Sequence, residues 1–318
     1  MTLIEIMISL VLLGIVSGVI MRVVMRQQRF YQGVNQIMLQ RGQLRQATAV
    51  VPVDLRSLSS VGNDILVATD SSMEFMVNVG TGVVCSVVNS AQVALPPPVL
   101  ANDQTITSWF GYGEPNPSSD PVAYTVYIYN DSVTLGNEDD VWKKYTLSGL
   151  HHDASRCLAT YTGIGDVGKL RPILELTDPA GFTDPVTGGP LSQYIGVGAP
   201  VRVLKQVRYA LYQASDGLWY LGFSQLLSAT STYSALSPVS GPYDPYGSAS
   251  GLGFRYYDVD GAEIASGANA TDRARIARID LIARARTASN VRTAGIQNGA
   301  TQQYRDSLAV SVMLRNRQ

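Results

Sequence analysis

The stretch that decides the fold opens the chain: Met1-Thr2-Leu3-Ile4-Glu5-Ile6-Met7-Ile8-Ser9-Leu10-Val11-Leu12-Leu13-Gly14-Ile15-Val16-Ser17-Gly18-Val19-Ile20-Met21. From Leu3 to Val24 the only charged residues are Glu5 and Arg22. These twenty-two residues, as an α-helix rising 1.5 Å per residue, would span about 33 Å, which is enough to cross the apolar core of a bilayer. Hydrophobicity alone therefore predicts a membrane-anchoring helix.

Glu5 is unusual within such a helix. A carboxylate inside an apolar helix is costly in lipid and needs a partner, yet no cation lies within one helical turn of it. The nearest free positive charge is an amino terminus, either of the same chain or of a neighbouring one. A secretory signal peptide does not explain the segment. Such a peptide has a basic n-region, a shorter apolar stretch and a cleavage site of small residues, and this segment has none of these features. An ordinary membrane anchor is the simpler alternative.

The opening residues resemble the start of mature type IV pilins and type II secretion pseudopilins. The resemblance rests on Thr2-Leu3-Ile4-Glu5-Ile6-Met7-Ile8 followed by an apolar run, at the start of the chain. It implies that Met1 is the processed first residue, left by a prepilin peptidase that then methylates it; Phe is the commoner residue there. It also implies that Glu5 neutralises the N-terminal amine of an adjacent subunit during docking, a desolvated pair that is expensive to break.

Gly14 and Gly18 form a small-xxx-small pair that allows another helix to approach closely. Many major pilins have a proline at position 22, where the helix is partly melted, and this chain has Arg22 instead. Beyond the apolar run an amphipathic rod is predicted, because apolar residues recur every seven positions at Phe30, Ile37, Leu44 and Val51. Pro52 predicts that the helix ends near Val51, so residues 1–52 are expected to form the membrane and assembly helix.

Residues 53–318 read as a mainly β head of short alternating runs separated by polar turns. The predicted strands are Asp64–Thr69, Met73–Val79, Gly82–Val88, Val122–Tyr129, Val141–Leu147, Val203–Tyr212, Leu218–Phe223, Gly253–Tyr257, Ile276–Ala285 and Leu308–Leu314. Three Gly/Pro/Ser-rich insertions, near 95–120, 177–200 and 229–250, are long for a compact domain. They are expected to be either surface-binding loops or flexible decorations.

The C-terminal part adds a second resemblance. The order of its motifs is similar to that of the larger minor pilins of the PilW kind and of J-type pseudopilins. The motifs are Leu252-Gly253-Phe254-Arg255-Tyr256-Tyr257-Asp258, then Asp260-Gly261, the strand Ile276–Arg286 and the closing Met313-Leu314-Arg315. The three insertions fall outside this resemblance.

The chain has 20 arginines and 4 lysines within a net charge of -1. Arginines gather near the N-terminus and at the C-terminal end; solvated strand faces and subunit contacts explain this more simply than DNA binding does. The two cysteines, Cys85 and Cys157, lie beyond the apolar segment, so in an exported head one disulfide is predicted, with two free buried thiols as the alternative.

Several patterns resemble ligand sites but fit structural roles better. Gly163–Gly168 matches GxGxxG, yet it lacks the preceding strand and following helix of a dinucleotide site. Asp258–Glu263 resembles the start of a calcium loop but lacks EF-hand spacing, so a hairpin turn at Asp260-Gly261 is expected. The acidic run Asn137–Asp140 is expected to be a solvated loop, and calcium binding is the alternative at both places. The adjacent His151 and His152 would point to opposite faces of a strand, which suits a shared metal poorly. No catalytic constellation, metal site or cofactor site is predicted, and the chain is not expected to be an enzyme.

The expected fold is α+β: a long N-terminal α-helix, its first half transmembrane, packed on an antiparallel β-sheet head with long loops, as in type IV pilins. The expected function is that of a structural subunit of a type IV pilus or pseudopilus. The subunit would be held in the bacterial inner membrane by one span before assembly, and would lie in an extracellular or periplasmic filament afterwards. Its expected partners are other pilin-like subunits, the membrane, a prepilin peptidase and an assembly platform.

A minor pilin that primes assembly, or that lies at or near the tip, is the leading version. A principal repeating subunit is the alternative within the family. A tip adhesin, with a possible sugar-binding aromatic face, or a DNA-capture subunit is the alternative from another class, and a stand-alone membrane-anchored sensor or binding protein lies outside the family. The sequence does not say which machine the subunit serves.

Overall fold

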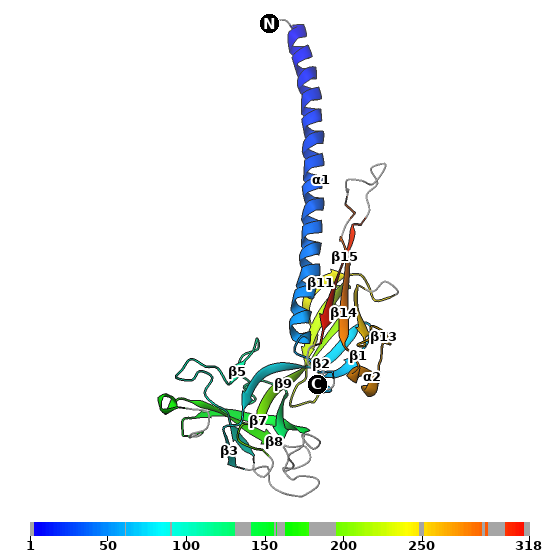
Figure 1. The fold of residues 1–318 in the computed structure, drawn as a ribbon. Helices are drawn as coiled ribbons and strands as arrows, with labels where there is room; N and C mark the ends of the chain where they lie inside the picture. The colour runs from blue at the N-terminus through cyan, green and yellow to red at the C-terminus, as the bar shows by residue number, and fades with distance from the viewer. Residues whose placement is uncertain are drawn as a thin grey trace.

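The computed structural model describes residues 3–60, 62–89, 91–130, 141–155, 157, 163–177, 195–247, 251–287, 290–291 and 303–314. One long helix, α1, rises from a head made of strands, with its N-terminal end far from the head (Figure 1). The described strands pair antiparallel. The fold class is therefore α+β, as predicted.

α1 runs over Leu3–Leu55, 53 residues, and Pro52 lies inside it. The predicted end near Val51 is wrong, because the helix continues one turn beyond it and Arg56 N donates to Pro52 O at 3.1 Å. A proline inside a helix costs about 3 kcal/mol. Val51, Leu55 and Leu58 are 0% exposed, and burying an aliphatic side chain contributes about 1.5–3 kcal/mol each. Packing of the last turn on the head therefore outweighs the local cost of the proline.

Only the C-terminal part of α1 packs on the head. Most of its buried residues follow a spacing of three and four: Gln40, Leu44, Ala47, Val51 and Leu55; Pro52 and Asp54 are also buried, in the last turn. Ile37 is half-buried, whereas Phe30 is 64% exposed, so the predicted packing series does not include Phe30. The head first meets the helix near Gly33, which lies against Val291. Phe30 lies almost one turn before that contact begins.

The described strands form two sheets, one of eleven strands and one of four. The larger sheet has β1 (Ile65–Ala68), β2 (Ser72–Val83), β3 (Ser86–Asn89), β4 (Gln92–Ala94), β5 (Ser108–Trp109), β6 (Tyr124–Asn130), β7 (Val141–Asp153), β8 (Arg171–Thr177), β9 (Pro200–Gln213), β10 (Trp219–Gln225) and β11 (Ser237–Tyr243). The smaller has β12 (Leu252–Tyr257), β13 (Glu263–Ile264), β14 (Arg278–Arg286) and β15 (Arg305–Met313), and a short helix α2 (Ala270–Ala274) precedes β14.

The longest pairing in the head joins β2 and β9, from Ser72↔Ala210 to Val83↔Pro200. On its other edge β9 pairs first with β6 and then with β10. The ladder is interrupted by a bulge between Asn78 and Gly80. The chain therefore leaves β2 and returns to β9 at neighbouring positions, and the strands β3–β8 that lie between them in sequence belong to the same sheet.

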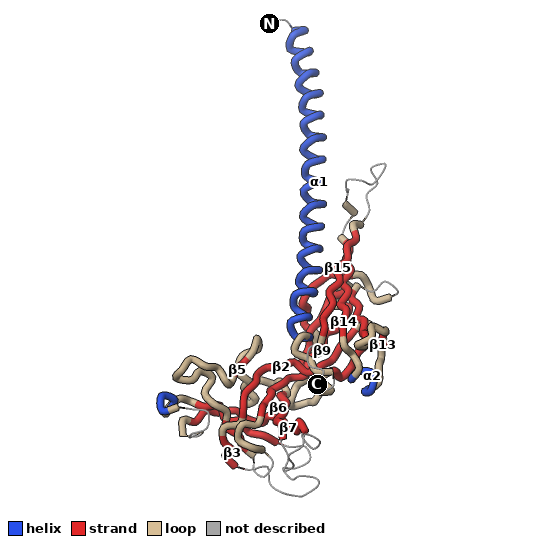
Figure 2. The backbone as a smooth tube through the Cα atoms, in the orientation of Figure 1, coloured by secondary structure: helices blue, strands red, loops and turns tan. Residues whose placement is uncertain are grey.

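Two separate hydrophobic cores flank this β2–β9 ribbon. One core joins the end of α1 to β1, β10–β12, β14, β15 and the nearer halves of β2 and β9; we call this part the helix-side lobe. The other core joins β4, β6, β7, β8 and the far ends of β2 and β9, within residues 79–203; we call it the distal lobe. Figure 2 shows the distal lobe, with β3, β5 and β7, projecting to the opposite side of the helix axis from β13–β15.

Each predicted strand overlaps an observed one, but Gly82–Val88 is not one strand. The chain changes partners within it: Val84 N donates to Ala199 O at 2.8 Å, and Cys85 N donates to Ala94 O at 2.9 Å. The strand therefore ends beside β9, and a new one begins beside β4.

Two of the predicted insertions contain structure that holds the head together, so they are not merely surface decorations. Ser237–Tyr243 forms β11, which pairs with β10 and contacts the helix, since Tyr243 OH donates to Gln43 O at 3.0 Å. Ser108–Trp109 forms β5, which lies beside β2 at Gly80. Of the third insertion, residues 178–194 lie outside the described part.

Candidate functional site

The candidate site is the N-terminal part of α1, which the rest of the described chain leaves uncovered. An 18-residue window here has a mean hydropathy of 2.4 and is 0% buried, so the helix is long and apolar enough to cross a membrane. Its large apolar side chains are mostly about half exposed or more; those up to Ile20 include Leu3, Ile4, Met7, Ile8, Leu10, Val11, Leu12, Leu13, Ile15, Val16 and Val19. Soluble monomers seldom expose apolar surface on this scale, which marks a membrane or protein contact.

The residues predicted for docking lie on this uncovered segment. The backbone of Glu5 belongs to the first turn of α1, while Met1 lies outside the described residues. Nothing lies within 4 Å of a Cβ built on Gly14 or Gly18. The spacing of four residues places both glycines on one face, so the surface they offer is free for another helix.

Below this segment, side-chain contacts fix the helix to the head. Gln40 is 7% exposed, and its Nε2 donates to the carbonyl of Ala285 at the end of β14. Arg41 Nε lies 3.0 Å from Asp306 Oδ2 and Arg41 Nη2 donates to Tyr304 OH at 2.9 Å. Gln43 Oε1 accepts from the backbone N–H of Gly241 at 3.1 Å. The angle of the helix on the head is therefore set by β11, β14 and β15.

A buried polar cluster joins the last turn of α1 to both lobes. Asp54 Oδ2 accepts from Tyr209 OH at 2.8 Å and from Tyr112 OH at 2.9 Å. Burial raises the pKa of Asp54, while the two tyrosine hydroxyls and nearby Lys205 oppose the rise. Lys205 is 4% exposed, its Nζ lies 3.4 Å from the centroid of the Tyr112 ring, and burial lowers its pKa to about 8.

Beside this cluster lies a cavity of about 290 Å³. Val53, Asp54, Ser57, Val77, Asn78, Phe110, Gly111 and Tyr112 line it. Asn78 Oδ1 is buried there without a hydrogen-bond partner among the described residues. Sequence reasoning missed the whole cluster, because the partners of Asp54 lie 58 and 155 residues away along the chain.

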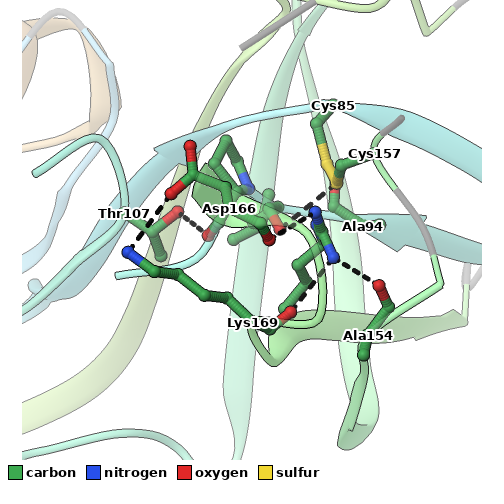
Figure 3. Close-up of a disulfide and its surroundings, with 10 residues drawn as sticks. Cys85, Ala94, Thr107, Ala154, Cys157, Asp166 and Lys169 are labelled. Atoms are coloured by element: carbon green, nitrogen blue, oxygen red, sulfur yellow. Dashed lines mark hydrogen bonds and ion pairs between the residues drawn. A yellow bond between two sulfur atoms is a disulfide. The ribbon is translucent and has the colours of Figure 1, made fainter. Parts of the chain in front are cut away.

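Cys85 and Cys157 form a disulfide, and the alternative of two free thiols is wrong. Their Cα atoms are 5.1 Å apart, and the pair is buried with Ala94 and Ile173 in the distal lobe (Figure 3). The bond closes a sequence separation of 72 residues. It therefore ties the segment before β8 to the turn between β2 and β3.

The GxGxxG stretch is a structural loop between β7 and β8. Its residues Ile164–Asp166 form a 3₁₀ turn, and the next element is strand β8, not a helix. Asp166 is 3% exposed and accepts backbone N–H donors from Ala101 at 2.6 Å and Gly163 at 2.9 Å. The segment thus lacks the strand–turn–helix geometry that places a pyrophosphate on a helix N-terminus.

The other acidic and histidine patterns are also held by their own neighbours. Asp258 Oδ1 accepts from the backbone N–H of Asp260 at 3.1 Å and of Ala262 at 2.8 Å, so a hairpin turn joins β12 to β13, as predicted. His151 Nδ1 lies 3.2 Å from Glu175, and His152 Nε2 lies 3.1 Å from Glu114. Within the described residues no group of three or more His, Cys, Asp or Glu side chains is arranged to hold a metal. The acidic run at residues 137–140 lies outside them.

Many arginines of the head pair with acids of the same head. The pairs are Arg202–Asp64 at 3.0 Å, Arg275–Asp258 at 2.9 Å, Arg278–Asp280 at 3.2 Å and Arg286–Asp244 at 3.1 Å. These arginines therefore form ion pairs within the head, on strand faces and in loops.

Compared with models of protein families, with curated proteins and with solved structures, the chain has no match.

Proposed function

We propose that this chain is a structural subunit of a type IV pilus or a type II secretion pseudopilus. The observation that carries the proposal is the uncovered apolar half of α1, which carries Glu5 and continues into a half that packs on the head. A rod built this way has one surface for lipid or neighbouring helices and another for its own head. The resemblance of the opening residues to pilins points the same way.

The exposed apolar segment must be shielded from water both before and after assembly. In the bacterial inner membrane the lipid provides it for a single-pass helix. In the filament the helices of other subunits replace the lipid, with close approach at Gly14 and Gly18. Glu5 then pairs with a positive charge of a neighbouring subunit, which the resemblance identifies as an N-terminal amine. A prepilin peptidase and an assembly platform complete the expected partners.

Two features bear on where the head lies before assembly. The disulfide of Cys85 and Cys157 favours an oxidising compartment such as the periplasm. The arginines that follow the apolar run would, by themselves, favour a cytoplasmic head. We give the disulfide more weight, because such bonds persist in oxidising compartments, while the charge rule compares both flanks of a span. The head is therefore assigned to the periplasmic side, and later to the pilus or pseudopilus.

Within the family we favour a minor subunit that primes assembly or lies at or near the tip, like the PilW-type minor pilins. The distal lobe supports this version, because a lobe that projects to the far side of the helix axis would have to be accommodated at every repeat of a principal subunit. DNA capture gains little support, because arginines of the C-terminal part already pair with acids. A tip adhesin stays an alternative, since Phe110 and Tyr112 are about 40% exposed at the cavity.

The test is substitution of Glu5 in the cell that makes the filament. Glu5→Gln and Glu5→Leu should leave the protein inserted in the membrane. Because losing one partner of a desolvated pair costs about 3–5 kcal/mol, we expect incorporation into filaments to fall by at least about 100-fold. Quantitative mass spectrometry of purified filaments and of membranes measures both pools, and the copy number in wild-type filaments separates a minor from a principal subunit.

Ser17→Ala is the matched control, since Ser17 is an exposed polar residue of the same segment. It should leave incorporation unchanged. Incorporation of both Glu5 variants at the wild-type level would refute the docking role.

A further inference from the structure

The helix that carries the assembly surface is strongly basic. Between Ile6 and Val53 the sequence has five arginines, no lysine and no acidic residue. Arg41 is neutralised by Asp306 of the head. Arg22, Arg26 and Arg29 are exposed, and no ion-pair partner for them lies within the described part of the chain. A group of three uncompensated guanidinium groups therefore lies where the apolar run ends.

These three arginines share one face of α1. Their spacing of four and three residues aligns them along the helix. The same spacing continues to Gly33 and then to the residues that pack on the head: Ile37, Gln40, Leu44, Ala47 and Val51. The helix face that packs on the head from Gly33 onward is therefore basic on the N-terminal side of Gly33. The three arginines lie on the same side of the helix as the head.

Their position along the helix matches the boundary of a bilayer. The nineteen residues Leu3–Met21 span about 28 Å, and a bilayer core is about 30 Å thick. Arg22 thus lies at the edge of the core, and Arg26 and Arg29 lie about 6 and 10 Å further. A headgroup layer adds roughly 5–7 Å on each side. Helical side chains slope toward the N-terminus, so long arginine side chains reach back into that layer.

The next two residues also suit an interface. Phe30 and Tyr31 are 64% and 65% exposed, with their rings 6.1 Å apart, and neither lies within the core of the head. Aromatic side chains are enriched at the level of lipid headgroups. The three arginines and the aromatic pair therefore all lie within the ten residues that follow the apolar span.

We infer that Arg22, Arg26 and Arg29 form a binding surface for the phosphates of anionic phospholipids, which we call the arginine collar. The inference rests on the proposed membrane stage of the subunit. A guanidinium group binds a phosphate through paired, charge-assisted hydrogen bonds, and three such groups on one face can bind adjacent headgroups. The alternative partner, an acidic surface of another subunit, accounts less well for the match between the collar and the end of the apolar span. The collar holds the subunit at a fixed depth, with the head beside the membrane surface.

The test is a distance measurement on the full chain inserted in vesicles of phosphatidylethanolamine and phosphatidylglycerol. Solid-state NMR detects the dipolar contact between the guanidinium carbons of ¹³C-labelled arginine and the lipid ³¹P. The chain without substitutions should show this contact, and the variant Arg22→Gln/Arg26→Gln/Arg29→Gln should lose it. Arg45→Gln/Arg56→Gln is the matched control: both arginines are exposed, and Arg45 lies about 35 Å from Arg22 along the helix axis. The control should retain the full contact.

Insertion is measured on the same samples by resistance to alkaline extraction and by contacts between leucine carbons and acyl-chain protons. An inserted helix whose arginines show no contact with phosphorus, or show contacts with carboxyl carbons of another subunit instead, overturns the collar and leaves the proposed function intact. A helix that fails to insert overturns the membrane stage itself. A contact that survives the triple substitution also overturns the inference, because other arginines would then bind the lipid.

Discussion

Asp54 connects three parts of the molecule with one carboxylate: it belongs to α1, and its two donors come from β9 and from the loop after β5. Burial raises the pKa of Asp54 above its usual value of 3.8. The native carboxyl therefore binds a proton at a higher pH than the unfolded chain does. Its contribution to stability is fully present below the unfolded pKa and is lost as the pH rises through the native pKa.

Removing the Tyr209 hydroxyl should increase this pH dependence. That hydroxyl lowers the pKa of Asp54, so Tyr209→Phe raises the native pKa further and leaves a buried carboxylate with one donor fewer. We expect the free energy of unfolding to fall by about 1–3 kcal/mol at neutral pH, and by less as the pH is lowered, because protonation of Asp54 removes the buried charge. Urea unfolding of the detergent-solubilised chain at the two pH values measures the difference. Tyr212→Phe, on the same strand, is the control, and an equal loss at both pH values would contradict the assignment.

The residues that could be recognised from sequence are those whose partners lie nearby or whose pattern is local. Cys85 and Cys157 were predicted to pair from their count, and the turn at Asp260-Gly261 from its composition. The Asp54 cluster could not be predicted, because Lys205 and Tyr209 read as ordinary residues of an alternating strand. Only the tertiary fold brings the buried carboxylate of Asp54 next to Lys205 and Tyr209.

At the scale of single elements, the packing face of α1 should carry most of the stability that joins helix to head. Leu44 is 2% exposed in the helix-side core, while Met38 is 65% exposed on the same helix. We expect Leu44→Ala to lower the free energy of unfolding by about 2–5 kcal/mol, and Met38→Ala to change it by less than about 0.5 kcal/mol. Denaturation followed by fluorescence measures both, since Trp219 packs on this core. Similar losses for the two variants would show that the helix packs differently.

The elements with strong local periodicity were predicted, and those that depend on neighbours were not. The long helix, β12 and β14 follow directly from apolar runs and alternation. β8 was missed because Pro172 interrupts its pattern; the strand forms because it lies between β7 and β4, where Ile173 and Leu174 are buried. β11 was missed because Gly241 and Pro242 read as loop, although the strand is held by β10 and by Gln43.

At the scale of the whole molecule, the two lobes should respond differently to loss of the disulfide. Cys85 and Cys157 close a long loop within the distal lobe, and such a bond typically contributes about 2–4 kcal/mol. In Cys85→Ala/Cys157→Ala we expect amides of β3, β4 and β8 to exchange faster by roughly two orders of magnitude. Amides of β12 and β14, in the other sheet, should keep their protection.

Hydrogen exchange with mass spectrometry resolves these segments. A reductant should reproduce the effect in the unsubstituted chain and have no further effect on the double variant. Uniform loss of protection in both lobes would mean that the head unfolds as a single unit.

The ribbon of β2 and β9 also has a mechanical consequence. The segment that builds the distal lobe leaves β2 at Val83 and returns to β9 at Pro200, which are paired at one end of the ladder, while α1 packs near the other end. A force that draws the distal lobe away from the rod therefore runs along these two strands. Strands pulled lengthwise against their neighbours load many hydrogen bonds together in shear, instead of opening them one at a time. A pull on the distal lobe is therefore resisted by the whole length of the β2–β9 ribbon at once, not by one hydrogen bond after another.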